Sequence, residues 1–154
     1  MDVGGVGTFD IINGRYTLVV DARRDTANMT PVLSPHTHAE WTFTTSPGQG
    51  RVALPLLDVR YDLPLDNQNT YAAGKPLVGK VSVAYQPGAP RSYVPGVGVE
   101  YSYDDGKTWH QARVTGSRLE IPPGRGDFVS LRATACDVTG NSVVETVIHA
   151  YAVK

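Results

Sequence analysis

An all-β sandwich is the fold that this sequence predicts, and three observations indicate it. Apolar residues recur at every second position in most of the regular stretches, which is the pattern of strands with one buried face. Turn-forming residues separate these stretches, and the chain contains 16 Gly and 11 Pro. Sustained apolar stripes of helical period, with capping residues at their ends, are missing. We therefore expect eight or more short antiparallel strands in an immunoglobulin-like or fibronectin type III-like sandwich.

The expected strands follow one another along the chain. The first two surround Leu18 and Trp41, where apolar and polar side chains alternate. The last one has apolar residues at both parities, and we expect it to be buried on both faces. A short turn at 69–73 is the nearest approach to a helix. The seven expected strands are 15–20, 40–44, 57–62, 80–85, 97–103, 129–135 and 143–151.

The segment Ser46–Gly50 is the expected domain boundary, because it is short, polar and rich in Gly and Pro. Residues 49–154 have the length of one immunoglobulin-like or fibronectin type III-like β-sandwich. Residues 1–48 supply too few strands to be stable alone. These N-terminal strands either pack on the sandwich or form the end of a preceding β domain, and exposed strand edges would then offer a dimerisation surface.

Composition excludes several functional classes. Fourteen Lys and Arg against fifteen Asp and Glu give a net charge of -1, so the electrostatic field that steers nucleic acid to a protein is missing. The longest apolar runs fall well short of the roughly 18 residues of a membrane helix. The single Cys136 cannot form an internal disulfide or a Cys-rich zinc site, and we expect a small packing residue. We expect no nucleic-acid partner and no membrane span.

Sequence motifs of common hydrolases are missing as well. The chain has no Gly-x-Ser-x-Gly nucleophile elbow, no Gly-x-x-x-x-Gly-Lys-Ser/Thr phosphate loop and no His-Glu-x-x-His pattern. We therefore expect no catalytic residue, no cofactor and no bound metal in this chain.

His36 and His38 are the pair of residues that a metal hypothesis would use. In an extended stretch their imidazoles would point to the same face, and Glu40 would add a third ligand. The interpretation that we favour is a solvated loop that leads into the next strand. His110 and His149 are isolated in the sequence, and we expect both to be surface side chains on strands.

Residues 102–109, Ser-Tyr-Asp-Asp-Gly-Lys-Thr-Trp, match the Asp-box pattern Ser-x-Asp-x-Gly-x-Thr-Trp. We interpret this motif as a structural hairpin turn in which Asp104 and Asp105 accept backbone N–H groups. Gly106 would supply a positive φ, and Trp109 would fold back over the turn. A single copy does not make a sialidase, since a propeller requires repeated blades.

An aromatic binding surface is the alternative for this region. Tyr101, Tyr103 and Trp109 would form a platform for sugar rings or a peptide, with Tyr93 on the Pro-rich loop as a further member. Such a platform would make the chain a carbohydrate-binding module.

Two further turns carry charged residues. Residues 137–141 predict an Asx-type turn in which Asp137 accepts backbone N–H groups and Gly140 or Asn141 is left-handed. Calcium would use such a carboxylate, but the neighbouring sequence offers no further acidic ligands. Residues 125–127, Arg-Gly-Asp, match the cell-adhesion tripeptide. We expect a turn there, and a stand-alone adhesin is the functional alternative.

Four stretches from Leu54 onward carry a resemblance to a known family. They are 54–66, LPLLDVRYDLPLD; 85–90, YQPGAP; 99–109, VEYSYDDGKTW; and 129–141, VSLRATACDVTGN. These stretches resemble the C-terminal region of large secreted subtilisin-like serine peptidases of the S8 family from actinobacteria. In that region a Glu-Trp-Thr-Phe-like strand, here 40–43, also precedes the sandwich.

The resemblance implies a secreted, extracellular, non-catalytic accessory domain that belongs to a longer enzyme. Its first partner would be the catalytic domain of the same parent chain, with a protein or polysaccharide ligand as a second. The motifs around the subtilisin catalytic residues are absent, so no catalytic residue is carried over. Cys136 departs from the family, which commonly has Ser or Ala at that position.

Overall fold

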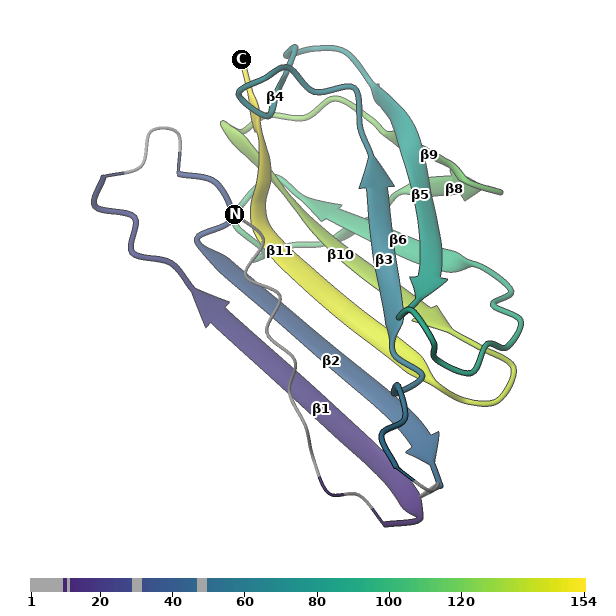
Figure 1. Ribbon diagram of the computed structural model, residues 1–154. Coiled ribbons are helices and arrows are strands. Elements are labelled where there is room, and N and C mark those ends of the chain that lie inside the picture. The colour runs from purple at the N-terminus through teal and green to yellow at the C-terminus, as the bar shows by residue number, and fades with distance from the viewer. Residues whose placement is uncertain (1–9, 11, 29–31, 47–49) are drawn as a thin grey trace.

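Two β-sheets pack face to face, so the expected all-β sandwich is confirmed (Figure 1). The structure is a computed structural model that describes residues 10, 12–28, 32–46 and 50–154. This described part forms no helix, and therefore none that could cross a membrane. The strands are β1 (Gly14–Arg23), β2 (His36–Thr45), β3 (Leu57–Asp62), β4 (Thr70–Tyr71), β5 (Leu77–Tyr85), β6 (Val97–Ser102), β7 (His110–Gln111), β8 (Arg113–Thr115), β9 (Arg118–Ile121), β10 (Phe128–Cys136) and β11 (Ser142–Val153).

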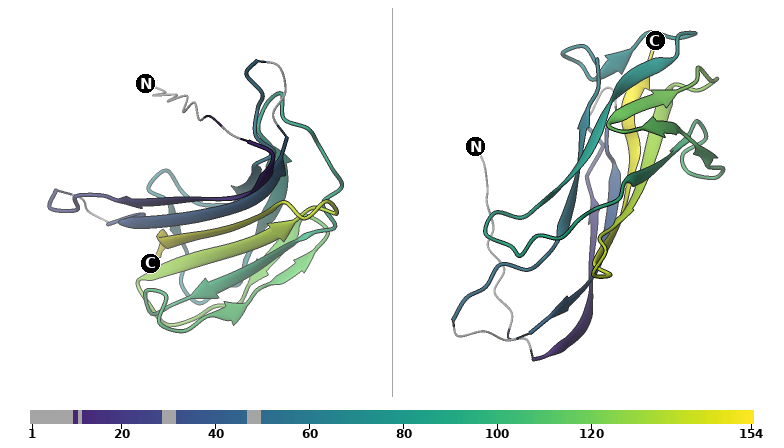
Figure 2. Two further views of the ribbon diagram at one scale, coloured as in Figure 1. Left: turned by 90° about the horizontal axis from the view of Figure 1, so that it is seen from below. Right: turned by 90° about the vertical axis from the view of Figure 1, so that its right-hand side faces the viewer.

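The larger sheet has the strand order β1-β2-β11-β10-β6-β7, and the smaller sheet has the order β3-β5-β9-β8. Neighbouring strands within these two orders are antiparallel. The short β4 pairs parallel with the end of β11. Figure 2 shows the same two sheets from two further directions.

The hydrophobic core lies between the sheets, as the alternation along β10 requires. Leu131 and Ala133 of β10 are buried, whereas the next residue, Thr134, points to the other face of the sheet and is exposed. Full burial of one Leu or Val side chain stabilises the fold by roughly 1.5–3 kcal/mol. The buried core residues are Leu57, Val59, Leu77, Val81, Val99, Tyr101, Ala112, Leu119, Ile121, Val129, Leu131, Ala133, Ala135, Val143 and Tyr151.

The β1–β2 hairpin extends the larger sheet past the region that β3 and β5 face (Figure 1). Trp41 of β2 lies opposite Val143 of β11, and Leu18 of β1 lies opposite Trp41. The Trp41 indole N–H donates a hydrogen bond of 2.7 Å to the Leu57 carbonyl of the smaller sheet. The N-terminal strands are thus hydrogen-bonded into the same sheet as the C-terminal strand. The central residues 47–49 of the expected boundary Ser46–Gly50 lie outside the described residues, and the division into two domains stays a prediction.

All seven expected strands are present, with bounds that differ by a few residues. The strand expected at 97–103 ends at Ser102, where the Asp-box turn begins. The stretch 69–73 contains the two-residue strand β4 and no helical turn. Most of β11 is half-buried on both parities, which agrees in part with the expected burial of both faces. Period-two alternation does not predict β4, β7, β8 and β9, because these strands have only two to four residues each.

Candidate functional site

The Asp-box turn joins β6 to β7 and is organised around Asp104. One oxygen of this carboxylate accepts the backbone N–H of Thr108 at 2.8 Å, and the other accepts the Thr108 hydroxyl at 2.7 Å. The Ser102 hydroxyl donates to Asp104 at 2.7 Å and accepts the backbone N–H of Gly106 at 2.9 Å. The hydrogen bonds from Thr108 and Ser102 lower the pKa of Asp104 to about 2. The interpretation as a structural turn is confirmed for Asp104.

Two consecutive left-handed residues make the turn tight. Gly106 has a φ of 82°, as expected, and Asp105 has a φ of 61°. A Cβ at Gly106 would lie 3.1 Å from both Ile148 and Trp109, so Trp109 folds back over the turn. The guanidinium of Arg132 lies 4.5 Å from the centre of the Trp109 ring. One face of this indole is therefore occupied by a side chain of the protein.

Tyr101 and Tyr103 lie together, with 5.6 Å between their ring centroids and an edge-to-face geometry. Tyr101 is 9% exposed and belongs to the core. The Tyr103 hydroxyl donates a hydrogen bond of 2.6 Å to the Pro122 carbonyl. A Cβ at Gly124 would clash with the Tyr103 ring, which therefore packs directly against this glycine. Both rings serve mainly to pack the sandwich.

The other two aromatic residues of the expected platform lie elsewhere. Trp109 packs against Arg132, on the face of the larger sheet opposite to the buried Tyr101. Tyr93 is 70% exposed, and its carbonyl accepts the backbone N–H of Val138 beyond the far end of β10. The structure therefore unites Tyr101 with Tyr103 and does not bring Trp109 or Tyr93 onto the same surface.

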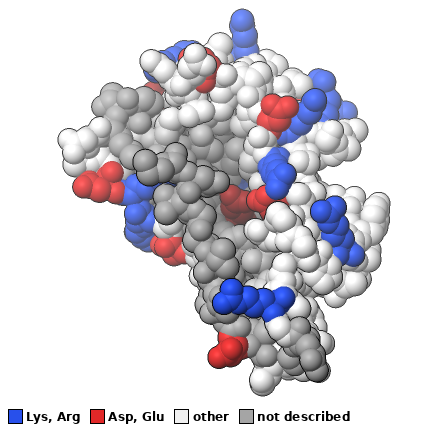
Figure 3. Space-filling view, viewed as in Figure 1, with Lys and Arg blue, Asp and Glu red and all other residues white. Residues whose placement is uncertain are grey.

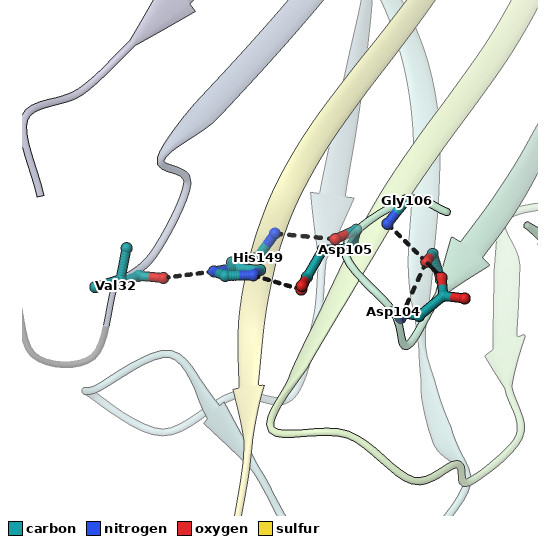
Figure 4. A network of polar contacts seen from close by, with 7 residues as sticks. Val32, Asp104, Asp105, Gly106 and His149 are labelled. Carbon is teal, nitrogen blue, oxygen red and sulfur yellow. Dashed lines mark hydrogen bonds and ion pairs between the residues drawn. The ribbon is translucent and has the colours of Figure 1, made fainter. Parts of the chain in front are cut away.

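His149 of β11 connects the Asp-box turn to the segment before β2 (Figure 4). Its Nε2 is 2.7 Å from Asp105 Oδ1, and its Nδ1 is 3.0 Å from the Val32 carbonyl oxygen. The ring stacks on Phe128 with 4.1 Å between centroids. Because a carboxylate and a carbonyl both accept, the two contacts are satisfied together when each ring nitrogen carries a proton. Asp105 thus binds the imidazole of a residue distant in sequence. We expected it to accept a backbone N–H of its own turn, and that expectation is wrong.

The backbone at His149 is strained. Its φ is 52°, and the β10–β11 pairing is irregular opposite this residue, between Val129 and Leu131. The His149 N–H donates to the Ser130 hydroxyl at 3.1 Å, and its carbonyl accepts the Ser34 N–H at 3.0 Å. A left-handed residue of this kind costs of the order of 1–3 kcal/mol and persists only where its surroundings fix it. The expectation of an isolated surface histidine is wrong. At the irregularity in β11, His149 contacts both the Asp-box turn and the segment before β2.

The predicted same-face arrangement of His36 and His38 is present. His36 Nε2 lies 2.8 Å and His38 Nδ1 lies 3.2 Å from the same oxygen of Asp21 in β1. These hydrogen bonds, first from His36 and then from His38, lower the pKa of Asp21 to about 2. Both histidines lie within β2 and not in a loop, and Asp21, in place of Glu40, completes the cluster. The described part of the chain contains no group of three ligands arranged to hold a metal ion.

Asp137 organises the turn between β10 and β11. One carboxylate oxygen accepts the Tyr85 hydroxyl at 2.6 Å and the Asn141 side-chain amide at 2.7 Å. The other accepts the backbone N–H groups of Thr139 and Asn141 and the Thr139 hydroxyl, at 2.8–3.0 Å. Burial raises the pKa of Asp137, but the donors, led by Tyr85, outweigh it and lower the pKa to about 2. The expected Asx-type turn is confirmed, with Gly140 at a φ of 90°.

The adhesion tripeptide and the cysteine lie at the surface. Residues 125–127 form the expected exposed bend before β10, and the Asp127 carbonyl accepts the Val153 N–H at 2.8 Å. Cys136 is exposed at the end of β10. The expectation of a packing residue is wrong, because the strand parity that buries Ala135 turns Cys136 away from the core.

A shallow hollow of about 380 Å³ opens beside β11. Burial raises the pKa of Glu145 in its wall, and burial also raises the pKa of Tyr61. In Figure 3, charges of both signs are scattered over the face that the picture shows and do not gather into one patch of a single sign. The lining residues are Tyr61, Leu63, Leu65, Asp66, Asn69, Leu131, Glu145, Val147 and Ala150.

Sequence reasoning missed the partners that come from distant strands. Asp21 lies opposite His38 in the hairpin register, but the twelve residues between β1 and β2 contain no short turn from which the sequence would predict that register. Tyr85 and Asp137 are 52 residues apart, and His149 and Asp105 are 44 residues apart. No local pattern predicts either pair, because each depends on how the strands are ordered in the sheets.

Comparisons with family models, with curated proteins and with solved structures found no match to this chain.

Proposed function

We propose that this chain is a non-catalytic accessory domain of a secreted subtilisin-like serine peptidase, with an immunoglobulin-like or fibronectin type III-like fold. One observation carries the proposal. The stretches that resemble the C-terminal region of those peptidases contain β3, most of β6 and β10, and the turns that follow β6 and β10. Leu57 and Leu131 in these stretches are core residues, and Asp104 and Asp137 organise two turns. The resemblance therefore includes residues that form the core and residues that organise the turns.

The internal contacts of the polar residues support an architectural role. Asp104 and Asp137 accept hydrogen bonds from their own turns, and His149 connects three segments. Such groups hold a structure in one conformation. The sandwich would then stabilise a neighbouring catalytic domain by burying surface against it, or would hold the enzyme near a protein substrate.

The positions of the aromatic residues disfavour the carbohydrate-binding alternative. A sugar platform needs exposed rings that face one surface. Tyr101 is buried, and Arg132 covers one face of Trp109. We therefore do not propose this function.

The test is the size and activity of the native gene product. Culture supernatant of the producing organism is immunoblotted with an antibody to this domain, and the captured material is assayed for proteolysis with and without a serine-peptidase inhibitor. We expect a band far above 16.6 kDa that carries inhibitor-sensitive proteolysis. A band near 16.6 kDa without activity would contradict the proposal. Proteolysis by the purified 154-residue chain would contradict its non-catalytic part.

A further inference from the structure

The outer edge of β1 is the longest strand edge without a partner in the described part of the chain. β1 has ten residues and ends the larger sheet, whereas the other terminal strands, β7, β3 and β8, have two, six and three (Figure 1). Near its middle, Val19 is 51% exposed and Val20 is 46% exposed. Natural sheets usually shorten or charge such an edge, because its free N–H and C=O groups pair with another strand. Here the charged residues lie toward the ends of the strand, and the centre is apolar.

The side chains of β1 divide between the two faces of the sheet. Leu18 lies opposite Trp41, whose indole contacts the smaller sheet, so the even-numbered residues of β1 lie on the inner face. Arg15 and Asp21 therefore both lie on the outer face, three residues before and three residues after Leu18.

This pattern is complementary to itself. If two copies of β1 pair antiparallel about Leu18, each Arg15 lies opposite the Asp21 of the other copy, on the same face. Tyr16 then lies opposite Val20, and Leu18 lies opposite its own copy. A pairing centred on Val19 would instead place Arg15 opposite Arg23, with two like charges facing each other. Charge thus favours the register about Leu18 over the register about Val19.

The Asp21 carboxylate is able to accept a further donor. Its Oδ2 receives both histidines, whereas Oδ1 has a long contact of 3.4 Å with Arg23 Nε. The Asp21 side chain is 43% exposed. On the other strand end, Arg15 makes a long contact of 3.4 Å with the Gly140 carbonyl. The contacts that an Arg15–Asp21 ion pair between two copies would replace are therefore both long, at 3.4 Å.

We propose that two copies of this chain associate through β1, antiparallel and in register about Leu18, with two reciprocal Arg15–Asp21 ion pairs. The two sheets join into one continuous sheet across a two-fold axis. One pair of ten-residue strands buries less surface than a stable protein interface, so the dimer is weak and depends on concentration. This inference does not depend on the proposed function, and its failure would leave that function open.

Charge reversal tests the register by sedimentation velocity over a concentration series. R15D or D21R alone puts like charges at both ends of the pair, and each weakens dimerisation by about tenfold or more. An equimolar mixture of R15D and D21R restores complementary pairs and dimerises about as well as the unsubstituted chain. R91D, at an exposed loop position, changes the net charge as R15D does and leaves dimerisation unchanged. Circular dichroism verifies that each variant folds.

A cysteine at the two-fold axis gives a second test that leaves Asp21 intact. In a C136S background, L18C places two cysteines opposite each other with Cα atoms about 4.5–5.5 Å apart, within reach of a disulfide. V20C, on the same face, lies opposite Tyr16 and forms no cross-link. We expect a covalent dimer for L18C alone. A chain that stays monomeric at every concentration, a mixture that fails to pair, or equal cross-linking of V20C would overturn the proposal.

Discussion

The turns around Asp104 and Asp137 show how one kind of local chemistry serves two structural purposes. Asp104 follows β6, beside the start of β10, and Asp137 follows the end of β10. Each carboxylate accepts a threonine hydroxyl and a threonine N–H within its own turn, and each has a pKa lowered to about 2. The difference is the origin of the remaining donors. Those of Asp104 come from Ser102 in the same turn, whereas Asp137 also binds Tyr85 of the other sheet.

Because Asp137 is buried, this difference affects stability. Asp137 is 4% exposed, so its charge depends on protein donors in place of water. The Tyr85 hydroxyl joins the smaller sheet to the β10–β11 turn of the larger one. Asp104 thus stabilises only its own turn, at one end of the sandwich, whereas Asp137 also connects the two sheets at the other end.

Removal of the buried carboxylate is the change expected to have the largest effect. Asp137→Ala leaves the Tyr85 hydroxyl and the Asn141 amide without their acceptor in a buried site. We expect the free energy of unfolding to fall by about 3–5 kcal/mol, as for other broken buried networks. Urea denaturation measures this loss. The matched control is Asp127→Ala, at an exposed bend, which we expect to change stability by less than about 0.5 kcal/mol. Equal losses in the two variants would contradict the link between the sheets.

The contrast between the two turns also separates what was predictable from what was not. The strands follow from period-two alternation, which is a local property of stretches such as 57–62. The Asx-type turns follow from residue type, because Asp137 and Gly140 have local conformational preferences. The contact of Asp137 with Tyr85 depends on the packing of two sheets, and no spacing in the sequence encodes it. The expectation for His149 is wrong for the same reason, since its left-handed backbone accompanies an irregular pairing between β10 and β11.

A smaller effect is expected from pH. Asp137 has a pKa of about 2 in the folded chain against an ordinary value near 3.8, so the folded state favours the charged carboxylate. Its contribution is present above the unfolded pKa and is lost as the pH falls from about 4 to about 2. Acidification therefore removes about 2 kcal/mol through this group.

The measurement compares the unfolding free energy of the unsubstituted chain and of Asp137→Asn between pH 5 and pH 2. Because the variant lacks this titration, we expect its stability deficit to shrink as the pH falls. Asp21 and Asp104 titrate in both proteins, so their effects cancel in the difference. Curves that stay parallel over the whole range would show that the network around Asp137 does not depend on its charge.

The smallest effect is expected at the exposed turn. Asp104→Ala removes the acceptor of the Thr108 N–H and hydroxyl, but water replaces it because the turn lies at the surface. We expect faster amide hydrogen exchange at Thr108 and Gly106, with unchanged exchange at the core residue Leu131 and a smaller loss of stability than in Asp137→Ala. Ser102→Ala should also accelerate exchange at Gly106, because the Ser102 hydroxyl accepts the Gly106 N–H. If exchange at Leu131 also accelerates, the Asp-box turn supports the whole sandwich, and the distinction between a local turn and a link between sheets fails.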